Sequence, residues 1–183
     1  MKLRIFMPFK ETKDGSLRLM TLGEIKMAKD IFRDTINYGK VWVHKGSYLP
    51  LGLQLQRVSM SPNGEMYFRK DYRSDFSSAD RIRQHIFIHE LSHVWQYQHS
   101  MNVKLRGLTS WAAKYDYSLD SWPLSTYGME QQAQIIADYY LLTQFNGRDD
   151  WKSYGLCRNC SELSDEELLR QYKYTLRSFP WSL

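Results

Sequence analysis

Four of the chain's five histidines lie in one short stretch, HIFIHELSHVWQYQH, at residues 85–99. Its centre, from His89 through Glu90 to His93, has the pattern HExxH. On a helix, His89 and His93 project from one face because they are four residues apart, and both imidazoles can bind one metal ion. Glu90 then lies close enough to act on a water at that metal. The stretch predicts a Zn2+ site, and catalytic zinc usually has a third protein ligand.

His99 is one candidate for the third ligand. It gives HExxHxxxxxH, the ligand spacing of the metzincins, in which a glycine breaks the helix and turns the chain. Gln96 occupies that glycine position, and no helix breaker lies between His93 and His99. If the helix continues, His99 points about 240° around the axis from His93 and away from the metal. The geometry therefore disfavours His99.

A carboxylate from a second helix is the other candidate, as in the His₂Glu sites of thermolysin-like enzymes. Glu130 opens an apolar helix expected over residues 128–145, and the intervening loop allows that helix to return antiparallel to the first. An ordinary surface glutamate favoured by the helix dipole is the alternative reading, but the need for a third ligand favours Glu130. Asp138, two turns further on, is expected to accept a hydrogen bond from a ligand imidazole or a nearby backbone group.

Such a site would hydrolyse an amide: a peptide bond is the leading substrate, and another amide such as a cell-wall crosslink is the alternative. Zinc would lower the pKa of a water toward about 7, and Glu90 would take its proton as general base and pass it to the leaving amine. The developing oxyanion also needs a hydrogen-bond donor. We expect Tyr127 to supply it, with Tyr139 and Tyr97 as alternatives that the sequence does not separate.

The remaining histidines are not expected to bind the metal. HExxH is a short pattern that a helix can carry by accident. Here it lies among apolar residues, where buried histidines would need partners. His85, one turn before His89, is expected to support the ligands or lie at the surface, and His44 to be exposed.

Several elements must position these residues, and together they predict an α+β fold. Thr21 and Glu24 form a capping-box pattern before a helix, and Ser164 and Glu167 form another. A hairpin is expected where Leu53 and Leu55 alternate with polar residues before a Pro-Asn-Gly turn. The expected elements are a helix at 21–35, a strand near 40–46, the hairpin at 53–70, the HExxH helix at 78–100, an irregular loop at 102–125, the helix at 128–145 and a last helix from 164.

We therefore expect one domain over residues 1–183, with 146–183 as a C-terminal extension of unassigned role. The HExxH helix would pack on a small antiparallel or mixed sheet, and the second helix would carry the Glu ligand. The 53–70 hairpin would offer a sheet edge along which a peptide substrate adds as a strand.

Composition describes an ordinary globular chain: 43% of its 183 residues are hydrophobic and its net charge is +5. The basic residues are scattered among acidic ones, so a nucleic-acid partner is not expected. No apolar run is long enough for a membrane span. The N-terminus does not read as a signal peptide, so we expect other means of export if the domain leaves the cell.

Cys157 and Cys160 are the two cysteines, in the sequence LCRNC. A lone CxxC fits half a zinc ribbon, a redox pair or a tight disulfide. No further ligands at ribbon spacing lie nearby, and redox pairs usually open a helix after a strand. A structural loop, reduced or bridged, is the favoured interpretation.

Four blocks in order, TLGEIKMAKDIF, SMSPNGEMYF, FIHELSHVWQYQ and EQQAQIIADYY, carry a resemblance. Over about residues 18–145 the chain resembles zincin-type metallopeptidase toxin domains at the C-termini of type VI secretion spike (VgrG-type) and Rhs-type proteins. The resemblance implies an antibacterial or anti-host effector, a VgrG- or Rhs-type carrier and a cognate immunity protein. It implies delivery into a target cell, with the periplasm as one candidate compartment. By position, His89 and His93 match the metal ligands, Glu90 the catalytic glutamate and Glu130 the third ligand.

Two other readings remain open from the sequence. A catalytically inactive module of the same fold would act by docking to a partner protein, although Glu90 would have no role in a closed structural site. A DNA-associated metallopeptidase would use the positive charge, although the single CxxC does not supply the separate zinc ribbon often found in such proteins.

Overall fold

The computed structural model describes residues 13–101, 103, 114–145 and 147–182. In these ranges the chain forms five α-helices and a three-stranded sheet, which confirms the α+β class. The helices are α1 (Leu22–Phe32), α2 (Arg81–Gln98), α4 (Met129–Gln144), α5 (Arg148–Tyr154) and α6 (Asp165–Thr175). The strands are β1 (Ser16–Leu19), β2 (Trp42–Lys45) and β3 (Met66–Phe68).

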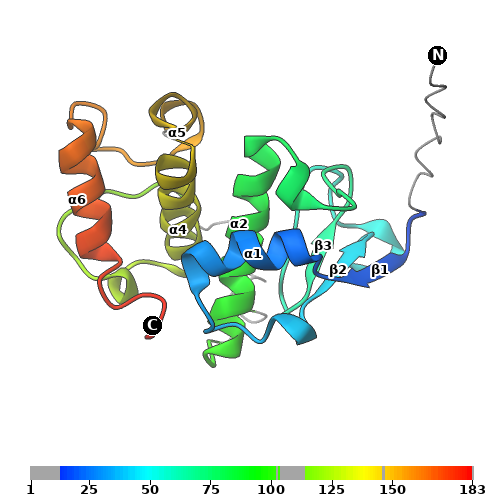
Figure 1. Ribbon diagram of the computed structural model, residues 1–183. Coiled ribbons are helices and arrows are strands. Elements are labelled where there is room, and N and C mark those ends of the chain that lie inside the picture. Colours follow the sequence, from blue (N-terminus) through cyan, green and yellow to red (C-terminus); the bar gives the residue numbers. More distant parts are fainter. Residues whose placement is uncertain (1–12, 102, 104–113, 146, 183) are drawn as a thin grey trace, which may run out of the picture.

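Helix α2 runs through the middle of the molecule, with α4, α5 and α6 on one side and the sheet on the other (Figure 1). The sheet is mixed and has the order β1-β2-β3: β1 pairs with β2 antiparallel, and β2 pairs with β3 parallel. Aromatic rings join the sheet to the helix, because Phe87 of α2 stacks on Phe76 at 4.9 Å and Phe76 lies 4.5 Å from Phe68 of β3. The HExxH helix is thus fixed against the sheet by buried apolar contacts.

Local capping signals set two helix starts as expected. The Thr21 hydroxyl accepts from the Glu24 backbone at 3.0 Å while the Glu24 carboxylate accepts from the Thr21 backbone at 2.9 Å. Ser164 and Glu167 form the same reciprocal pair before α6. Both capping boxes satisfy backbone donors that a helix start would otherwise leave unpaired.

The predicted hairpin is wrong over its first half. Leu53 and Leu55 are 69% and 72% exposed, whereas Gln54 between them is 2% exposed. The buried Gln54 amide donates to the backbone carbonyls of Val58 and Tyr67 at 2.6 and 3.2 Å. The Gln54 side chain thus makes hydrogen bonds that the backbone of a first strand would have made. The expected burial is also inverted, because the polar Gln54 is inside and the two leucines are outside.

The second half of that segment does return on itself. Met60 and Tyr67 exchange backbone hydrogen bonds of 3.2 and 2.9 Å across the Pro-Asn-Gly turn. Gly64 has φ +83°, and a Cβ there would lie 2.6 Å from the Tyr97 ring of α2. Only glycine allows this turn to lie so close to α2.

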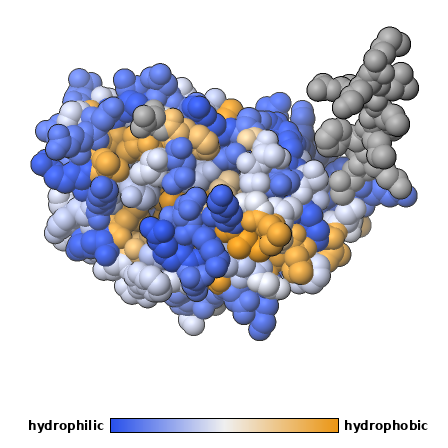
Figure 2. Space-filling view, in the orientation of Figure 1, coloured by the Kyte–Doolittle hydropathy of each residue, from blue (hydrophilic) through white to orange (hydrophobic). Residues whose placement is uncertain are grey.

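The surface in the view of Figure 2 shows hydrophobic residues in separate patches within a mostly hydrophilic face. Among the described residues, no helix is both long and apolar enough to cross a membrane. The described part of the predicted loop, residues 114–125, is irregular apart from the start of a short 3₁₀ turn, Leu124–Thr126. Residues 104–113 of that loop lie outside the described ranges.

Candidate metal centre

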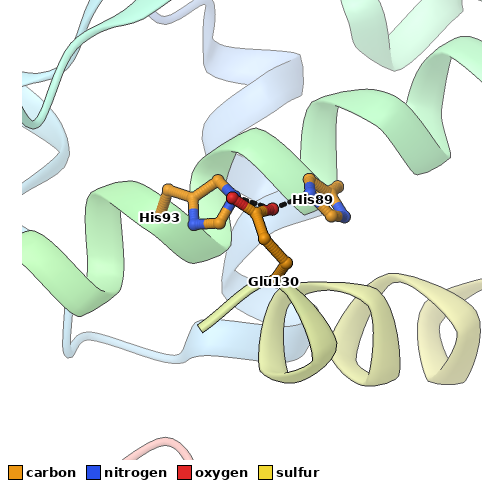
Figure 3. Close-up of side chains that lie close together, drawn as sticks. All are labelled: His89, His93 and Glu130. Carbon is orange, nitrogen blue, oxygen red and sulfur yellow. Dashed lines mark hydrogen bonds and ion pairs between the residues drawn. The ribbon is translucent and has the colours of Figure 1, made fainter. Parts of the chain in front are cut away.

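The structure brings His89, His93 and Glu130 together. His93 Nε2 lies 3.0 Å and His89 Nε2 3.3 Å from the same carboxylate oxygen, Oε2 of Glu130. One ligand atom from each of the three residues lies within 4.8 Å of the others. Figure 3 shows both imidazoles projecting from α2 toward the carboxylate, which reaches up from the first turn of α4.

The spacing of these atoms fits a divalent metal. Two atoms that each lie at a normal Zn–N or Zn–O distance from a tetrahedral ion are separated by about 3.3 Å. The two separations in the structure, 3.0 Å from His93 Nε2 and 3.3 Å from His89 Nε2 to Glu130 Oε2, are close to that value. Two imidazoles and one carboxylate are also a donor set that zinc uses in sites with an open fourth position.

A chain of side-chain amides fixes the tautomer of His93. The Gln96 amide donates to the Met129 carbonyl and to Gln132 Oε1, each at 3.0 Å, so its own oxygen faces His93. Gln132 in turn donates to the Tyr127 carbonyl at 2.9 Å. His93 Nδ1–H therefore donates to Gln96 Oε1 at 2.8 Å. The lone pair for a metal is left on Nε2, the atom that faces Glu130.

Electrostatics couple the carboxylate to the imidazoles. Burial raises the pKa of Glu130, but its hydrogen bonds to His89 and His93 outweigh burial and hold that pKa well below its usual value. Burial lowers the pKa of His93, and the Glu130 hydrogen bond and charge raise it to about 9. His89 Nε2, His93 Nε2 and Glu130 Oε2 are three acceptor atoms that face one another, and they require positive charge between them. A proton supplies it in the metal-free protein, and a divalent cation can replace that proton.

Glu90 lies beside the cluster without joining it. Its carboxylate is buried, and Oε2 accepts a hydrogen bond of 2.7 Å from the Ser61 hydroxyl. Burial raises the pKa of Glu90, against the opposing charges of His93 and His89 and the hydrogen bond from Ser61. Ser61 belongs to the turn that Gly64 allows to pack on α2. No pattern in the sequence signals this contact between Ser61 and Glu90.

The cluster opens into a cleft of about 90 Å³. Its lining comes from α2, from the first turn of α4 and from two loops, and comprises Val58, Ser59, Met60, Ser61, Pro62, His89, Glu90, His93, Val103, Tyr115, Met129 and Glu130. Tyr115 stacks on His89 with ring centroids 5.9 Å apart and planes at 27°. Burial, followed by the charges of Glu130 and Glu90, raises the pKa of Tyr115 to about 12. Its hydroxyl therefore stays protonated at neutral pH.

The tyrosine expected as oxyanion donor lies elsewhere. The Tyr127 hydroxyl donates to the Ser118 carbonyl at 2.8 Å, and its side chain lines a different surface hollow. Tyr97 packs against Gly64, and Tyr139 packs on Tyr172. Among the described tyrosines, Tyr115 alone lines the cleft of the cluster. A loop rich in aromatic residues was the only signal for it in the sequence.

The other histidines have separate partners. His85 Nε2 donates to the fully buried Asp138 at 2.8 Å, which leaves that nitrogen protonated and unable to bind a metal. His99 caps the end of α2 and lies against Trp95, away from the cluster, as the helix geometry predicted. His44, expected to be exposed, is partly buried and pairs with Glu65 at 2.7 Å.

The fold and site together define an α+β domain whose HExxH helix and a second, antiparallel helix share a His–His–Glu cluster suited to a divalent cation. No known protein-family model matches the chain.

A type VI secretion system spike protein of Pseudomonas aeruginosa, VgrG2b, is 39% identical over 133 residues, which cover 68% of this chain and 13% of that protein. The chain therefore spans a small part of its curated relative. The solved effector domain of VgrG2b from the same organism superposes with a TM-score of 0.64 and 36% identity, covering 77% of this chain and 84% of that one. The chain belongs to the family of the VgrG2b effector domain.

Proposed function

We propose that this domain is a zinc-dependent peptidase that acts as an effector. One observation carries the proposal: two imidazoles from α2 and a carboxylate from α4 converge at metal-ligand spacing while a buried, hydrogen-bonded Glu90 lies directly beside them. A purely structural metal site would not need Glu90, so that residue favours a catalytic centre over a docking module.

His89, His93 and Glu130 would hold the metal. When bound, zinc supplies Lewis acidity, which lowers the pKa of a water toward about 7 and polarises a substrate carbonyl. Gln96 keeps His93 in the tautomer that can bind through Nε2. Such an outer hydrogen bond also increases the basicity of the ligand.

Glu90 would serve as the general base. Its carboxylate accepts the proton of the attacking water and delivers it to the amine that leaves. Burial raises the pKa of Glu90 and makes it a stronger base than an exposed glutamate. The Ser61 hydroxyl holds one carboxylate oxygen, so the other is oriented for proton transfer.

The cleft favours a peptide substrate. Its walls include Met60, Val103 and Met129, which suit an apolar side chain, and the loop from Val58 to Pro62 offers backbone groups beside Glu90. An extended peptide could hydrogen-bond to that loop as a strand adds to a sheet edge. Hydrolysis of a peptide bond is the reaction this arrangement supports best.

The relatives suggest the biological setting. The similar protein is named as a type VI secretion spike, and the similar structure as its effector domain. We propose by analogy that this domain travels on a VgrG-type carrier and enters a target cell, with the periplasm as one candidate compartment. A cognate immunity protein would block the cleft in the producing cell.

The test combines metal content with cleavage. Purified protein loaded with zinc and freed of excess metal is expected to hold one equivalent by elemental analysis, with anomalous scattering at the zinc edge between His89, His93 and Glu130. Fluorescein-labelled casein is the probe for cleavage. Glu90→Gln should keep the metal and lose the cleavage by a factor of at least about 100.

Glu65→Gln is the matched control, since it makes the same change at a glutamate that pairs with His44 outside the cleft. It should cleave like the parent protein. Full activity in Glu90→Gln, or a zinc ion bound away from the three residues, would overturn the proposal.

A further inference from the structure

Tyr115 reaches the metal cluster from a short segment that we call the strap, residues 114–119. Its ring stacks on the His89 ring and forms part of the cleft wall. The strap contains no helix or extended strand, so its own backbone does not hold it in place. What fixes Tyr115 over the cluster must therefore come from a neighbouring element.

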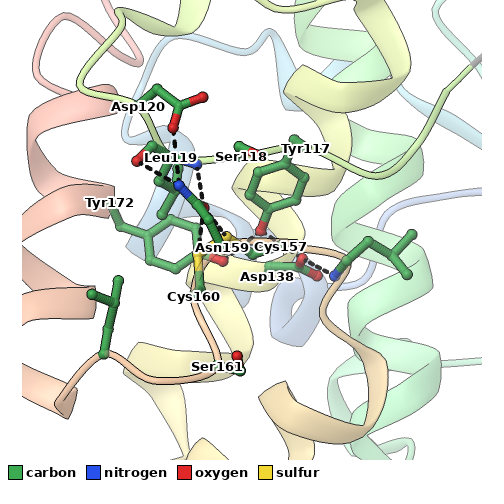
Figure 4. Close-up of a disulfide and its surroundings, with 12 residues drawn as sticks. Tyr117, Ser118, Leu119, Asp120, Asp138, Cys157, Asn159, Cys160, Ser161 and Tyr172 are labelled. Carbon is green, nitrogen blue, oxygen red and sulfur yellow. Dashed lines mark hydrogen bonds between the residues drawn. A yellow bond between two sulfur atoms is a disulfide. The ribbon is translucent and has the colours of Figure 1, made fainter.

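One such element is α4, where Gln131 donates to the Asp116 carbonyl at 2.8 Å. The other is the loop closed by the disulfide between Cys157 and Cys160 (Figure 4). The Tyr117 backbone donates to the Leu156 carbonyl at 3.1 Å and accepts from the Arg158 backbone at 2.8 Å, which makes a parallel bridge between Tyr117 and Cys157. Asn159 Oδ1 accepts from the Leu119 backbone at 3.0 Å. The Leu119 carbonyl also accepts from Asn159 Nδ2 at 3.4 Å, so four of the strap's backbone groups are bonded to residues 156–159.

Charged and polar side chains strengthen the same contact. Arg158 forms an ion pair with Asp116 of the strap, and Asn159 Nδ2 donates to Asp120 Oδ1 at 2.9 Å. Both Arg158 and Asn159 lie between the two cysteines. The contacts of Arg158 and Asn159 come from the turn that the disulfide closes, and an open loop samples many more conformations.

The far side of the loop is anchored to a rigid point. Asp138 of α4 accepts from the Leu156 backbone at 3.0 Å and from the Tyr117 hydroxyl at 2.7 Å. The anchor fixes where the loop begins, and the disulfide fixes how it turns. The two sulfurs differ in access, since Cys160 is fully buried and Cys157 is only partly buried.

We propose that the Cys157–Cys160 disulfide is a redox-controlled tether that positions Tyr115 over the metal centre, so that the domain is fully competent only when oxidised. This inference rests on the proposed peptidase function. Cys157 and Cys160 act as positioning residues through the strap, and Tyr115 is the side chain that they place against the cleft.

The redox step is ordinary thiol–disulfide exchange with a small-molecule or protein disulfide as oxidant. The accessible Cys157 thiolate attacks one sulfur of that disulfide, forms a mixed disulfide and releases the other sulfur as a thiolate. The Cys160 thiolate then attacks Cys157 Sγ and releases the second thiolate. Two protein thiols are oxidised, the external disulfide is reduced to two thiols, and the two protons pass to the released thiolates.

Such a tether suits a protein that moves between compartments. Disulfides are rare where thiol reductants are maintained and persist in oxidising compartments such as the bacterial periplasm. The domain would be held in its less competent form where it is made and would gain the tether where it is delivered. Because Cys157 is only partly buried, thiol–disulfide exchange can occur on the folded protein.

Hydrogen exchange of the strap amides tests the tether without any need for catalysis. Metal-free protein is compared in its oxidised form, in its reduced form and as the Cys157→Ser/Cys160→Ser variant. Without the crosslink, exchange at the Tyr117 and Leu119 amides should rise about tenfold, as expected when about one hydrogen bond of local stability is lost. Exchange within α2 should not change.

Ser161→Ala is the matched control, because this exposed residue follows the loop and leaves the crosslink intact. Asn159→Ala keeps the disulfide but removes a contact to Leu119, so it should loosen the Leu119 amide even when oxidised. If the double serine variant does not fold, the reduced protein and Asn159→Ala carry the test. If hydrogen exchange of the strap amides is unchanged in both the reduced protein and Asn159→Ala, the proposal is overturned.

Casein cleavage by zinc-loaded protein without reductant is the second readout. The double serine variant should lose about tenfold in kcat relative to Ser161→Ala while it binds zinc with similar affinity. Equal kcat values would overturn the tether even if the parent is an active peptidase. If the strap amides exchange faster without the crosslink but the parent protein does not cleave casein, the proposed peptidase function is overturned. The disulfide would then still be shown to hold the strap in place.

Discussion

Two histidine–carboxylate contacts join α2 to α4, and they look alike in sequence. In one, His89 and His93 face Glu130. In the other, His85 faces Asp138. Both contacts place imidazole nitrogen of α2 against a carboxylate of α4. Because the helices are antiparallel, the two contacts lie in succession along one interface.

The two contacts differ in how many hydrogen-bond donors reach the carboxylate. Asp138 is 0% exposed and accepts four hydrogen bonds, from His85, Gln134, Tyr117 and the Leu156 backbone. Glu130 is 8% exposed, lines a cleft and has one oxygen against two imidazole nitrogens. A saturated, fully buried carboxylate holds elements together. An unsaturated one beside a cleft is available for a cation.

Replacement of Asp138 by alanine is expected to have the largest effect on folding. It takes their shared acceptor away from four donors, three of which are buried side chains, and breaking such a network costs on the order of 3–5 kcal/mol in the free energy of unfolding. Urea denaturation of metal-free protein measures the loss. Asp149→Ala, at an exposed position of α5, is the control and should change it little. A loss under about 1 kcal/mol would mean that Asp138 does not hold the helices together as this comparison with Glu130 requires.

Glu130→Gln should show the opposite profile. The glutamine amide can still donate to the imidazoles, so the metal-free protein should lose only about 1 kcal/mol of stability. Its zinc affinity should fall by more than the roughly 10- to 100-fold typical of losing an outer partner of a ligand. Competition with a chromophoric chelator gives the dissociation constant. If Glu130→Gln binds zinc as tightly as the parent protein, Glu130 is not a metal ligand and does not differ in role from Asp138.

The sequence predicted the parts of this interface that depend on local geometry. The helical repeat places His89 and His93 on one face whatever surrounds them, and the same repeat relates Glu130 to Asp138 on α4. Capping boxes start α1 and α6 through contacts three residues apart. These are short-range effects, so the residue pattern alone is sufficient to anticipate them.

Other features depend on tertiary contacts that no local pattern encodes. The sequence placed Leu53 and Leu55 in a strand because they alternate with polar residues, but the buried Gln54 bonds to distant backbone and inverts the segment. Tyr115 reaches the cleft through a strap held from residues far along the chain. The loop that contains it offered several tyrosines, and spacing could not rank them.

A smaller effect is expected at Gln96, which touches neither the metal position nor Glu130. Gln96→Met keeps the volume but removes the acceptor for His93 Nδ1–H, so the tautomer is no longer fixed. Zinc affinity should fall by about 10- to 100-fold, less than for Glu130→Gln. Gln144→Met, at an exposed position of α4, is the matched control. An unchanged dissociation constant would show that the amide chain does not tune the ligand.

The smallest effect is expected from a change of pH, which alters the protonation of His93 beside Glu130. Contact with Glu130 raises the pKa of His93 to about 9, so its contribution to metal-free stability is complete below its unfolded pKa of about 6.5 and is lost as pH rises through 9. Zinc must displace that proton, so zinc affinity should rise about tenfold per pH unit from 7 to 9 and then level. Metal-free protein therefore loses stability over the range in which zinc binds more tightly. Thermal unfolding with and without zinc measures both trends. His93→Gln should abolish the pH dependence of metal-free stability, and a pH dependence that persists in this variant would assign the proton to another group.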